Sequence, residues 1–552
     1  MKEESDVLAE YVLVFFTNAC KTMGEEFGSY LPDIMPTLQE RIEAEEIIKF
    51  GSEDDEDVDG AVAGGGGGQD EEDDDEFEDI DDESDVYFAP EEGFVQAKKA
   101  AICCVGVMAE SCAPQFLPYL QPAIALILEN GIKSIHESIQ GEACEALSML
   151  VKSAAKNAGI HKNPKAGVLV EPLPQYAELL NTLARTVLIV CLSIITKSKS
   201  KSTVASALNA IGMVITSIGI LALNLDATND DDTNNWSGPV ANVLMATMLE
   251  LIQEKCPCQI GVEAKEDGDD EEEDHDQYIP DALSELMGDL SRVLGPAFIP
   301  YFDQFFPALM RYTKPSRSHS DRAMALGCIG DVSKELGPQA IKYAEAVLPV
   351  LQVSLQDPME SVRRNSAFCV GMLCQATEKQ LAPHFPHILH CLAPLCQRTA
   401  EEQNGGDSGG ADIDNTLSAV ARMIRSAPEA VPLQQVLPVI LDALPLRADH
   451  EEGENIYDCL IDLLKSKDEA TMSLFARVAG ALGTVLVEGS KSNDATKAMA
   501  ITAIHDLAMS PDHKDLLSAA VGAGPSTWGP EVTQAVTTAA SGNMPLPTSS
   551  AE

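Results

Sequence analysis

The sequence has few aromatic and few basic residues. Aromatic residues make up 5% of the 552-residue chain, with only 2 tryptophans, whereas Leu, Ala, Ile and Val are plentiful. This balance suits helices packed on helices better than a β-sandwich. The 37 Lys and Arg residues are outnumbered by 88 Asp and Glu, so the net charge is −51. Nucleic acid is a poor direct partner, because phosphate binding needs a basic face.

The sequence also lacks a secretory signal and an apolar run as long as a bilayer is thick. Its start, MKEESDVLAE, is acidic and has no basic region. The apolar runs 187–195 and 210–223 are shorter than the about 20 residues that span a bilayer. Most of the 14 cysteines are single residues in apolar stretches, the usage typical of a reducing compartment. We expect an intracellular chain that does not contact membrane.

The acidic residues are concentrated in two segments. Residues 53–85 hold 19 acidic residues and no Lys or Arg, and residues 263–276 hold 10 against a single Lys. Acidic, Gly-rich sequence buries too little apolar surface to fold alone, so we expect mobile loops. A shorter insert at 401–412 is predicted to be a third loop. The other residues are net acidic too, which makes a basic protein the natural partner.

Between these segments, apolar residues recur at helical spacing in a repeated unit. Residues 342–377 predict two helices, the first with an apolar face formed by Ala344, Val347, Leu348, Leu351 and Leu355. The second helix is apolar on two sides, which predicts a neighbour on each side. Similar units occur at 116–153, 176–219, 298–336, 385–426 and 433–465. The spacing of roughly 40 residues is the period of HEAT repeats.

The predicted fold is therefore all-α: a HEAT-repeat α-solenoid, a superhelix of antiparallel helix pairs with long acidic loops inside repeats. No long interior segment suggests a strand. The predicted organisation is first HEAT helices at 1–51, an acidic Gly-rich disordered loop at 52–86, HEAT repeats at 87–262, an acidic loop at 263–277, HEAT repeats at 278–522 with the short loop 401–412, and a low-complexity tail at 523–552.

Acidic residues on the predicted second helices and in the loops are the candidate contacts for a basic partner. Each one alone is more often a solvated charge, but together they predict a negative concave wall. The candidates are Asp73, Asp74, Asp75, Glu76, Phe77, Asp79, Glu142, Glu145, Asp270, Glu271, Glu272, Asp281, Glu285, Asp289, Asp321 and Asp331. Alternatively, the acidic loops bind no partner and are only tethers that keep the chain soluble.

Four residues in the 342–377 unit are predicted to be structural. Asp357, Pro358 and Glu360 fit the N-cap, N1 and N3 positions of the second helix. Asp357 and Arg363 resemble the Asp and Arg of many HEAT repeats, where such a pair caps the helix and bridges adjacent repeats.

Signals for catalysis or for a bound metal or cofactor are weak. The run GGGGGQDEE lacks the Gly-Lys-Ser/Thr ending of a phosphate-binding loop. Cys256 and Cys258 have no second Cys or His pair at a zinc-module spacing, so two buried or idle thiols are the preferred reading. His384, His387 and His390 do not share one helix face, because His390 is turned away from the other two. We expect no metal, no cofactor and no enzyme.

Four strings occur in the order found in a known family. They are HSDRAMALGCIGDVSKEL, ESVRRNSAFCVGMLCQA, DNTLSAVARMIRSAP and VLPVILDALPLRADHEE. In this order they resemble the carboxy-terminal half of the β-karyopherins, of the importin-4 type with the importin-5 type as a near sibling. The resemblance covers most of residues 1–465, and it implies a carboxy-terminal fragment of such a receptor.

The resemblance implies nuclear import of basic cargo such as core histones and ribosomal proteins, with shuttling between cytoplasm and nucleus. In this family Ran-GTP releases the cargo and binds chiefly to amino-terminal repeats without a counterpart here, so no Ran-binding residue is carried over. Nucleoporins are possible further partners, and a monomer is expected. The alternatives are a HEAT-repeat scaffold, which would bind through apolar surfaces, and a histone chaperone-like protein, which would bind histones without import.

Overall fold

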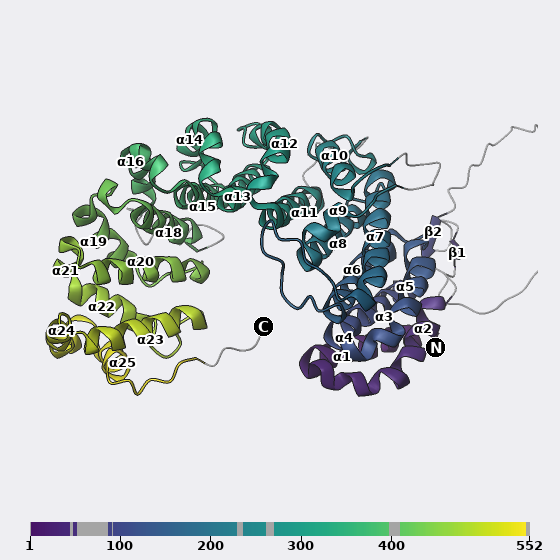
Figure 1. Ribbon diagram of the computed structural model, residues 1–552, viewed down its shortest axis with the longest axis horizontal. Coiled ribbons are helices and arrows are strands. Elements are labelled where there is room, and N and C mark those ends of the chain that lie inside the picture. The colour runs from purple at the N-terminus through teal and green to yellow at the C-terminus, as the bar shows by residue number, and fades with distance from the viewer. Residues whose placement is uncertain are drawn as a thin grey trace, which may run out of the picture. The chain divides into compact units, whose positions relative to one another are not determined.

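The computed structural model describes residues 2–44, 48–51, 87–90, 92–228, 236–260, 270–396 and 409–547. These residues fold almost entirely into α-helices that follow one another in pairs (Figure 1). Two compact units divide the chain. One comprises Met1–Lys162, Glu171–Ile194 and Ser202–Ser217, and the other Asn163–Val170, Ile195–Lys201 and Ile218–Glu552. The predicted all-α HEAT-type solenoid fold is confirmed.

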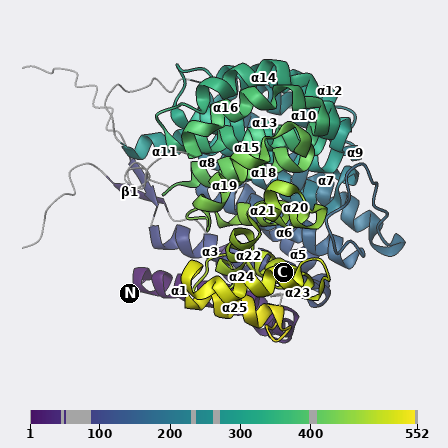
Figure 2. The same cartoon turned by 90° about the vertical axis from the view of Figure 1, so that its left-hand side faces the viewer.

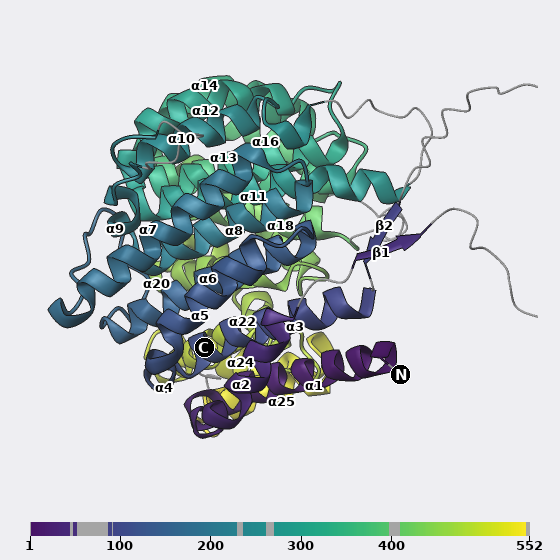
Figure 3. The same ribbon diagram turned by 90° about the vertical axis from the view of Figure 1, so that its right-hand side faces the viewer.

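In the first unit, long second helices stack on one another and shorter first helices pack beside them. Helix α3 lies between α1 and α6, and α2 packs on α3 and α5 (Figure 3). The elements are α1 (Lys2–Met23), α2 (Leu31–Glu43), β1 (Ile48–Gly51), β2 (Tyr87–Pro90), α3 (Glu92–Ser111), α4 (Ala113–Phe116), α5 (Leu120–Ile127), α6 (Glu137–Asn157) and most of α7 (Pro174–Lys197) and α8 (Lys201–Ile218).

The second unit repeats this arrangement through most of its length. Helices α12, α14 and α16 lie side by side over α13, α15 and α18, and α15 packs between α13 and α18 (Figures 1 and 2). Its helices are α9 (Ile220–Asn224), α10 (Val240–Ile252), α11 (Asp270–Leu294), α12 (Ile299–Tyr312), α13 (His319–Leu336), α14 (Ile341–Ser354), α15 (Glu360–Thr377), α16 (Phe385–Cys396), α18 (Ala411–Ser426), α19 (Leu433–Ala443), α20 (Gly453–Ser466), α21 (Glu469–Ser473), α22 (Phe475–Thr484), α23 (Asp494–Met509), α24 (Lys514–Thr527) and α25 (Pro530–Ala540).

Glycines let the second helices approach one another closely. A Cβ atom at Gly330 of α13 would lie 3.0 Å from the ring of Phe368, and one at Gly371 of α15 would lie 3.0 Å from Cα of Ala419 in α18. Both distances are tighter than ordinary van der Waals contact, so a side chain at either position would require its neighbour to move. The glycines in the apolar stripes of the sequence are therefore packing residues that set the spacing of the stack.

The acidic segment 52–86, which lies outside the described residues, is bracketed by two short strands that we did not predict. Strands β1 and β2 pair antiparallel, with Phe50 opposite Phe88 (Figure 3). Tyr87 and Phe88 thus belong to a strand. The pairing was not evident because each strand has only four residues and its partner is far away along the chain.

Three predicted boundaries are wrong, and one is the end of the loop 401–412, because α18 begins at Ala411. Helix α11 begins at Asp270, whereas we placed residues 263–277 in a loop. Acidic side chains favour a helix amino terminus, where the backbone N–H groups carry partial positive charge. The region 523–552 is not simply a low-complexity tail, because α24 and α25 extend to Ala540 and pack on α22 and α23. Val536 of α25 is fully buried there.

Helix α7 is longer than the apolar run within it. By length and composition alone, its 24 residues could cross a bilayer, but half of its most apolar window is buried inside the protein. A buried core helix passes the same test, so α7 gives weak evidence for a membrane segment. The apolar run at 187–195 is shorter than this helix, because the residues that flank the run are helical too.

Candidate functional site

The first unit places two of the candidate carboxylates on α6, where both are half-buried. The Cys103 thiol of α3 is close enough to Glu142 for each group to shift the pKa of the other. Burial raises the pKa of Glu142, and the negative charge of Glu145 raises it further. The Oε1 atom of Glu145 accepts a hydrogen bond of 2.9 Å from Ser206 Oγ on α8. The two carboxylates form a pair because they are three residues apart on α6, and α3 and α8 each contribute a neighbour to one of them.

In the second unit, three candidates lie close enough on α11 and α13 to influence one another. Partial burial raises the pKa of Asp281, and the charges of Glu285 and Asp321 add to that effect. Asp321 lies in the first turn of α13, where its backbone N–H donates to Ser318 Oγ, the N-cap. We call Asp281, Glu285 and Asp321 the carboxylate triad. Like charges held together in this way favour a bound cation.

The last two candidates surround an arginine. Arg292 Nη1 lies 2.7 Å from Asp289 Oδ1. Desolvation raises the pKa of Asp289 despite this ion pair. It also raises the pKa of Asp331, against the opposing charges of Lys334 and Arg292. Asp289 and Asp331 are therefore partly neutralised within the protein, and within the triad Asp321 Oδ2 likewise lies 3.8 Å from Arg317 Nη1.

The remaining loop candidates cannot be placed in a site. Asp73, Asp74, Asp75, Glu76, Phe77 and Asp79 lie outside the described residues. Asp270, Glu271 and Glu272 belong to the first turn of α11 instead of a loop. This turn precedes Asp281 and Glu285 of the triad in the same helix.

The predicted capping box at the start of α15 is wrong. The helix begins at Glu360, and Met359 takes the N-cap position, so Asp357 and Pro358 lie before the helix. Asp357 Oδ1 instead accepts a hydrogen bond of 3.0 Å from the Met359 N–H in a local turn. A turn of this kind competes with the N-cap role for the same side chain.

Glu360 caps a different helix from the one we predicted. Its Oε1 atom accepts hydrogen bonds of 3.0 Å from the backbone N–H groups of Gly410 and Ala411, at the start of α18. A carboxylate at a helix amino terminus satisfies free N–H groups and opposes the positive end of the helix dipole. Glu360 thus joins α15 to α18.

Asp357 and Arg363 do bridge repeats, but through partners that we did not predict. Arg322 of α13 binds Asp357 at 2.9 Å, and Arg363 Nε binds Asp412 of α18 at 2.7 Å. Arg363 Nη1 also donates to the carbonyls of Asp357 and Pro358, both at 2.7 Å. The residues form a chain of charged contacts across three second helices.

This chain continues to the segment just before α20 with residues that sequence reasoning missed. Buried Asp414 accepts hydrogen bonds from the backbone N–H groups of Ala448 and Asp449, at 2.8 and 2.9 Å. Arg422 Nη1 lies 2.9 Å from Glu452 Oε2. Such a network can be recognised in a sequence from polar residues in a helix that is otherwise apolar on all sides. Helix α18 has six buried polar residues of this kind: Asp412, Asp414, Asn415, Thr416, Ser418 and Arg422.

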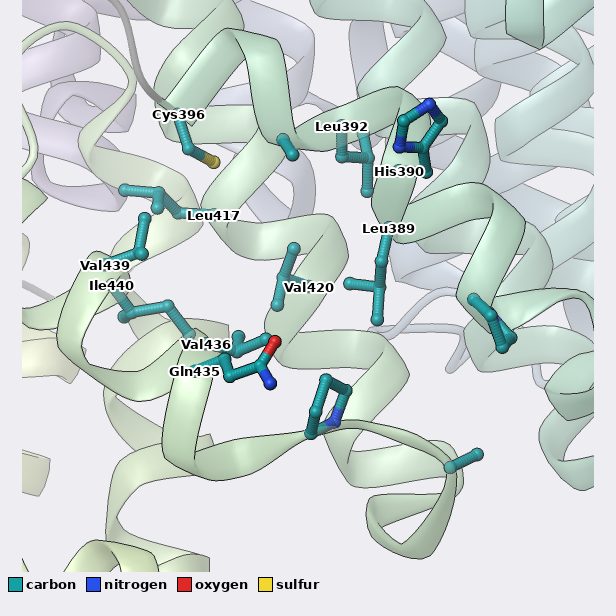
Figure 4. Close-up of a pocket in the computed structure, with 14 residues that line it drawn as sticks. Leu389, His390, Leu392, Cys396, Leu417, Val420, Gln435, Val436, Val439 and Ile440 are labelled. Carbon is teal, nitrogen blue, oxygen red and sulfur yellow. The ribbon is translucent and has the colours of Figure 1, made fainter.

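An apolar pocket of about 470 Å³ lies between α16 and α19, with α18 as its floor. Leu389, Val420 and Val436 extend into it from three helices (Figure 4). His390 is at its edge, while His387 Nε2 lies 3.3 Å from Gln352 Oε1 outside it. The histidines of this helix thus have separate surroundings.

Cys256 and Cys258 are both buried, as the structural reading predicted. Burial raises the pKa of Cys256 to about 12. Within the described ranges, no group of three or more His, Cys, Asp or Glu side chains is arranged to hold a metal ion.

Comparison with known proteins finds importins among the relatives of this chain. The family described as importin subunit beta-1-like, TPR repeats, matches residues 271–410. The chain is 26% identical to human importin-4 over 446 residues, which are 79% of this chain and 38% of the relative. It is 23% identical to a probable importin subunit beta-4 of Schizosaccharomyces pombe over 291 residues, which are 50% of this chain and 26% of the relative. The predicted resemblance to the β-karyopherins is confirmed.

Solved β-karyopherin structures share the fold. Kap121p bound to the SUMO protease Ulp1p gives a TM-score of 0.63 at 14% identity, covering 97% of this chain and 44% of that one. Kap121p bound to RanGTP gives 0.59 at 14% identity, with 96% and 44% covered. Kap121p bound to Nup53p gives 0.60 at 15% identity, with 97% and 44% covered. The chain thus spans less than half the length of the β-karyopherins it matches.

Proposed function

We propose that this chain binds basic protein cargo as part of a nuclear import receptor that moves between cytoplasm and nucleus. Two findings support the proposal: the resemblance to importin-4, and the HEAT-type stack shared with Kap121p in complex with other proteins. Core histones and ribosomal proteins are the proposed cargo class, because their Lys- and Arg-rich segments complement a chain of net charge −51.

The carboxylate triad is the observation that carries this proposal. Asp281 and Glu285 are exposed on α11, and Asp321 is half-buried on the adjacent helix. Partial burial raises the pKa of Asp281, and repulsion from the charges of Glu285 and Asp321 adds to that effect, which supports a negative patch at this point of the stack. A bound Lys or Arg side chain would relieve that repulsion. The pair Glu142 and Glu145 offers a second, smaller contact of the same kind.

The acidic segments are proposed to attract the cargo before these contacts form. Long-range attraction between opposite charges speeds association and weakens with salt. Segment 53–85 supplies 19 acidic residues for this purpose. An exposed ion pair contributes only about 0.2–1 kcal/mol, so several contacts must act together.

A titration of a fluorescent histone-tail peptide at low and physiological salt tests the proposal. The triad variant carries Asp281→Asn, Glu285→Gln and Asp321→Asn. Loss of three contacts should cost roughly 0.6–3 kcal/mol, or about 3- to 150-fold in affinity. A second variant lacks residues 53–85. The other acidic segment should not be deleted as a block, since residues 270–276 belong to α11.

A matched control removes three negative charges away from the triad. Glu429, Asp442 and Asp512 each lie in an exposed ion pair with Lys or Arg. The control variant Glu429→Gln, Asp442→Asn and Asp512→Asn should bind nearly as the unchanged chain does. Equal weakening of both variants would mean that only net charge matters, and no weakening of the triad variant would contradict the assigned site.

The peptide titration, combined with a nuclear import assay, separates the alternative functions. Binding that does not respond to salt would favour a HEAT-repeat scaffold that uses apolar surfaces. Salt-sensitive binding without nuclear accumulation of cargo in a permeabilised-cell import assay would favour a histone chaperone-like role. Accumulation that depends on the triad would support the import receptor.

The apolar pocket between α16 and α19 supports nucleoporins as a second partner class. Its lining is dominated by Leu, Val, Ala and Pro, so it suits an aromatic side chain of a Phe-Gly repeat. Filling the pocket with Ala393→Trp should weaken binding of a Phe-Gly peptide, whereas Ala393→Ser should not. Unchanged binding by the tryptophan variant would exclude this pocket.

A further inference from the structure

Beside the carboxylate triad, the loop between α12 and α13 places a cation that belongs to the chain itself. Arg317 Nη1 lies 3.8 Å from Asp321 Oδ2, and Arg317 Nη2 donates a hydrogen bond to the carboxylate of Glu254. The Arg317 guanidinium also lies over the ring of Tyr312, with 4.3 Å between Cζ and the ring centroid. A guanidinium that pairs with carboxylates and stacks on an aromatic ring has the surroundings typical of a bound arginine.

Two backbone contacts hold Arg317 at this place. Its N–H donates to the carbonyl of Lys314 at 3.0 Å, which closes a turn, and its own carbonyl accepts from Arg322 Nη1 at 2.6 Å. Burial opposes the charged form of Arg317, but the hydrogen bond and the charge of Glu254 outweigh it, so the pKa of Arg317 is raised. Arg317 is therefore a permanent positive charge at a fixed position.

Glu254 occupies a backbone position that suits glycine better. Its φ is +60°, and it follows the end of α10, where the Lys255 N–H donates to the Glu250 carbonyl at 3.0 Å in a Schellman turn. A residue other than Gly strains the backbone there. The contacts of the Glu254 side chain offset this strain, since Oε1 accepts from Arg317 and, at 3.1 Å, from the Tyr312 hydroxyl. We call Glu254 and Tyr312 the arginine pocket.

The charge of Arg317 acts directly on the triad. It lies beside Asp321, and the charge of Asp321 in turn reaches Asp281 of α11, where it helps to raise the pKa after burial has done so. A cargo cation bound by these carboxylates would lie near Arg317, and like charges repel. Arg317 and the cargo therefore compete for the negative charge of Asp321.

We propose that Arg317 is an internal competitor of the cargo, which fills the arginine pocket and thereby weakens the binding of a cargo Lys or Arg to the triad. The inference rests on the proposed function, because it assigns a residue that limits affinity to the same site. A transport receptor has to release its cargo as well as bind it, so a contact that limits affinity favours release.

The sign of the change in affinity when Arg317 is replaced tests this proposal. A fluorescent histone-tail peptide is titrated against the unchanged chain, the triad variant and the variants Arg317→Gln and Arg317→Ala. Loss of a purely structural residue would weaken binding or leave it unchanged, whereas loss of a competitor should strengthen it about two- to five-fold. Arg317→Lys keeps the positive charge and should give a smaller gain than either.

A second peptide, in which every Lys is replaced by Arg, reports on the arginine pocket. Arg317→Ala leaves this pocket vacant, so the Arg peptide should gain more affinity than the Lys peptide does, because a guanidinium can stack on Tyr312 and pair with Glu254. Equal gains for the two peptides would overturn the proposal, since the charge of Arg317 would then act only at a distance.

A matched control separates the local effect from net charge. Arg477 lies in an exposed ion pair with Asp442, away from α11 and α13, so Arg477→Gln removes one positive charge elsewhere and should leave the affinity almost unchanged. An equal gain with Arg477→Gln would overturn the proposal. Circular dichroism should show the helix content of the unchanged chain in Arg317→Gln, whose amide still reaches Glu254.

The triad variant distinguishes failure of this proposal from failure of the proposed function. If the triad variant binds more weakly than the unchanged chain but Arg317→Gln does not bind more tightly, only the competition is overturned. If the triad variant binds as the unchanged chain does, the assigned cargo site fails and the competition fails with it. A gain from Arg317→Gln that disappears when the triad is also replaced would support both.

Discussion

Removing the charge of Asp412 should loosen the contact between α15 and α18 more than any change of a surface ion pair. Asp412 and Arg363 are 1% and 7% exposed, and Arg363 Nε lies 2.7 Å from the carboxylate. Breaking a buried ion pair by removing one partner costs about 3–5 kcal/mol, because the other charge is left buried and unpaired. Two backbone carbonyls still accept from Arg363, so Asp412→Asn should cost about 3 kcal/mol.

Urea unfolding, followed by hydrogen exchange of peptides covering α15 and α18, measures this effect. A stack of repeats need not unfold in a single step, so exchange at 411–426 reports the local loss that a global signal could miss. Glu429→Gln is the matched control, since it removes one partner of an exposed pair with Lys379. The control should leave the free energy of unfolding almost unchanged, because its ion pair is fully exposed to solvent.

A loss below about 1 kcal/mol for Asp412→Asn would refute the reasoning, because the buried pair would then not hold the two helices together. The double variant Arg363→Met and Asp412→Leu gives a further check. It leaves no unpaired charge, so it should be closer to the unchanged chain than Asp412→Asn is. If the double variant loses as much free energy of unfolding as the two single variants together, the loss is caused by altered packing and not by an unpaired charge.

Three further outcomes follow from the structure. Glu142→Gln should speed the alkylation of Cys103 by iodoacetamide, which mass spectrometry measures. The reason is that burial and the Glu142 charge raise the pKa of this thiol to about 12. An unchanged rate would mean that burial alone raises the pKa of Cys103. Because the pKa of Asp281 is raised, its contribution to the free energy of unfolding is greatest at acid pH and declines as the pH rises through the raised value. Cargo affinity should rise over the same pH window, because Asp281 then becomes charged. In pH titrations, Asp281→Asn should reduce the pH dependence of both stability and affinity. Gly483→Ala should lower the thermal stability by about 1–3 kcal/mol, because its Cβ would lie 2.5 Å from Val536 of α25; no change would mean that α25 does not pack there.

Local periodicity predicted most of the fold because each helix pair buries faces that are visible in the sequence. The apolar spacing around Leu351 matches α14, and the doubly apolar pattern around Cys369 matches α15, which is covered on both sides. The start of α11 at Asp270 was missed because acidic residues, which indicate a loop by composition, also favour a helix amino terminus.

The candidate site was predictable only in part, for a physical reason. The sequence identifies Asp281 and Glu285 as neighbours on one helix face, since they are four residues apart. It does not give the register of α11 against α13, which brings Asp321 close to them. The partner of Arg363 was hidden in the same way, because Asp412 lies 49 residues away, whereas Arg322 and Asp357 are 35 apart.

The cap that Glu360 places on α18 has a practical consequence for labelling this protein. The start of α18 is fixed by hydrogen bonds from Gly410 and Ala411 to a residue of α15, and by the ion pair of Asp412 with the same helix. The position of α18 is therefore set by its neighbour rather than by the residues that precede it in the chain. A fluorescent-protein or affinity tag inserted between Cys396 and Gly409 should leave these contacts intact, which makes this the preferred attachment point for following the chain in cells.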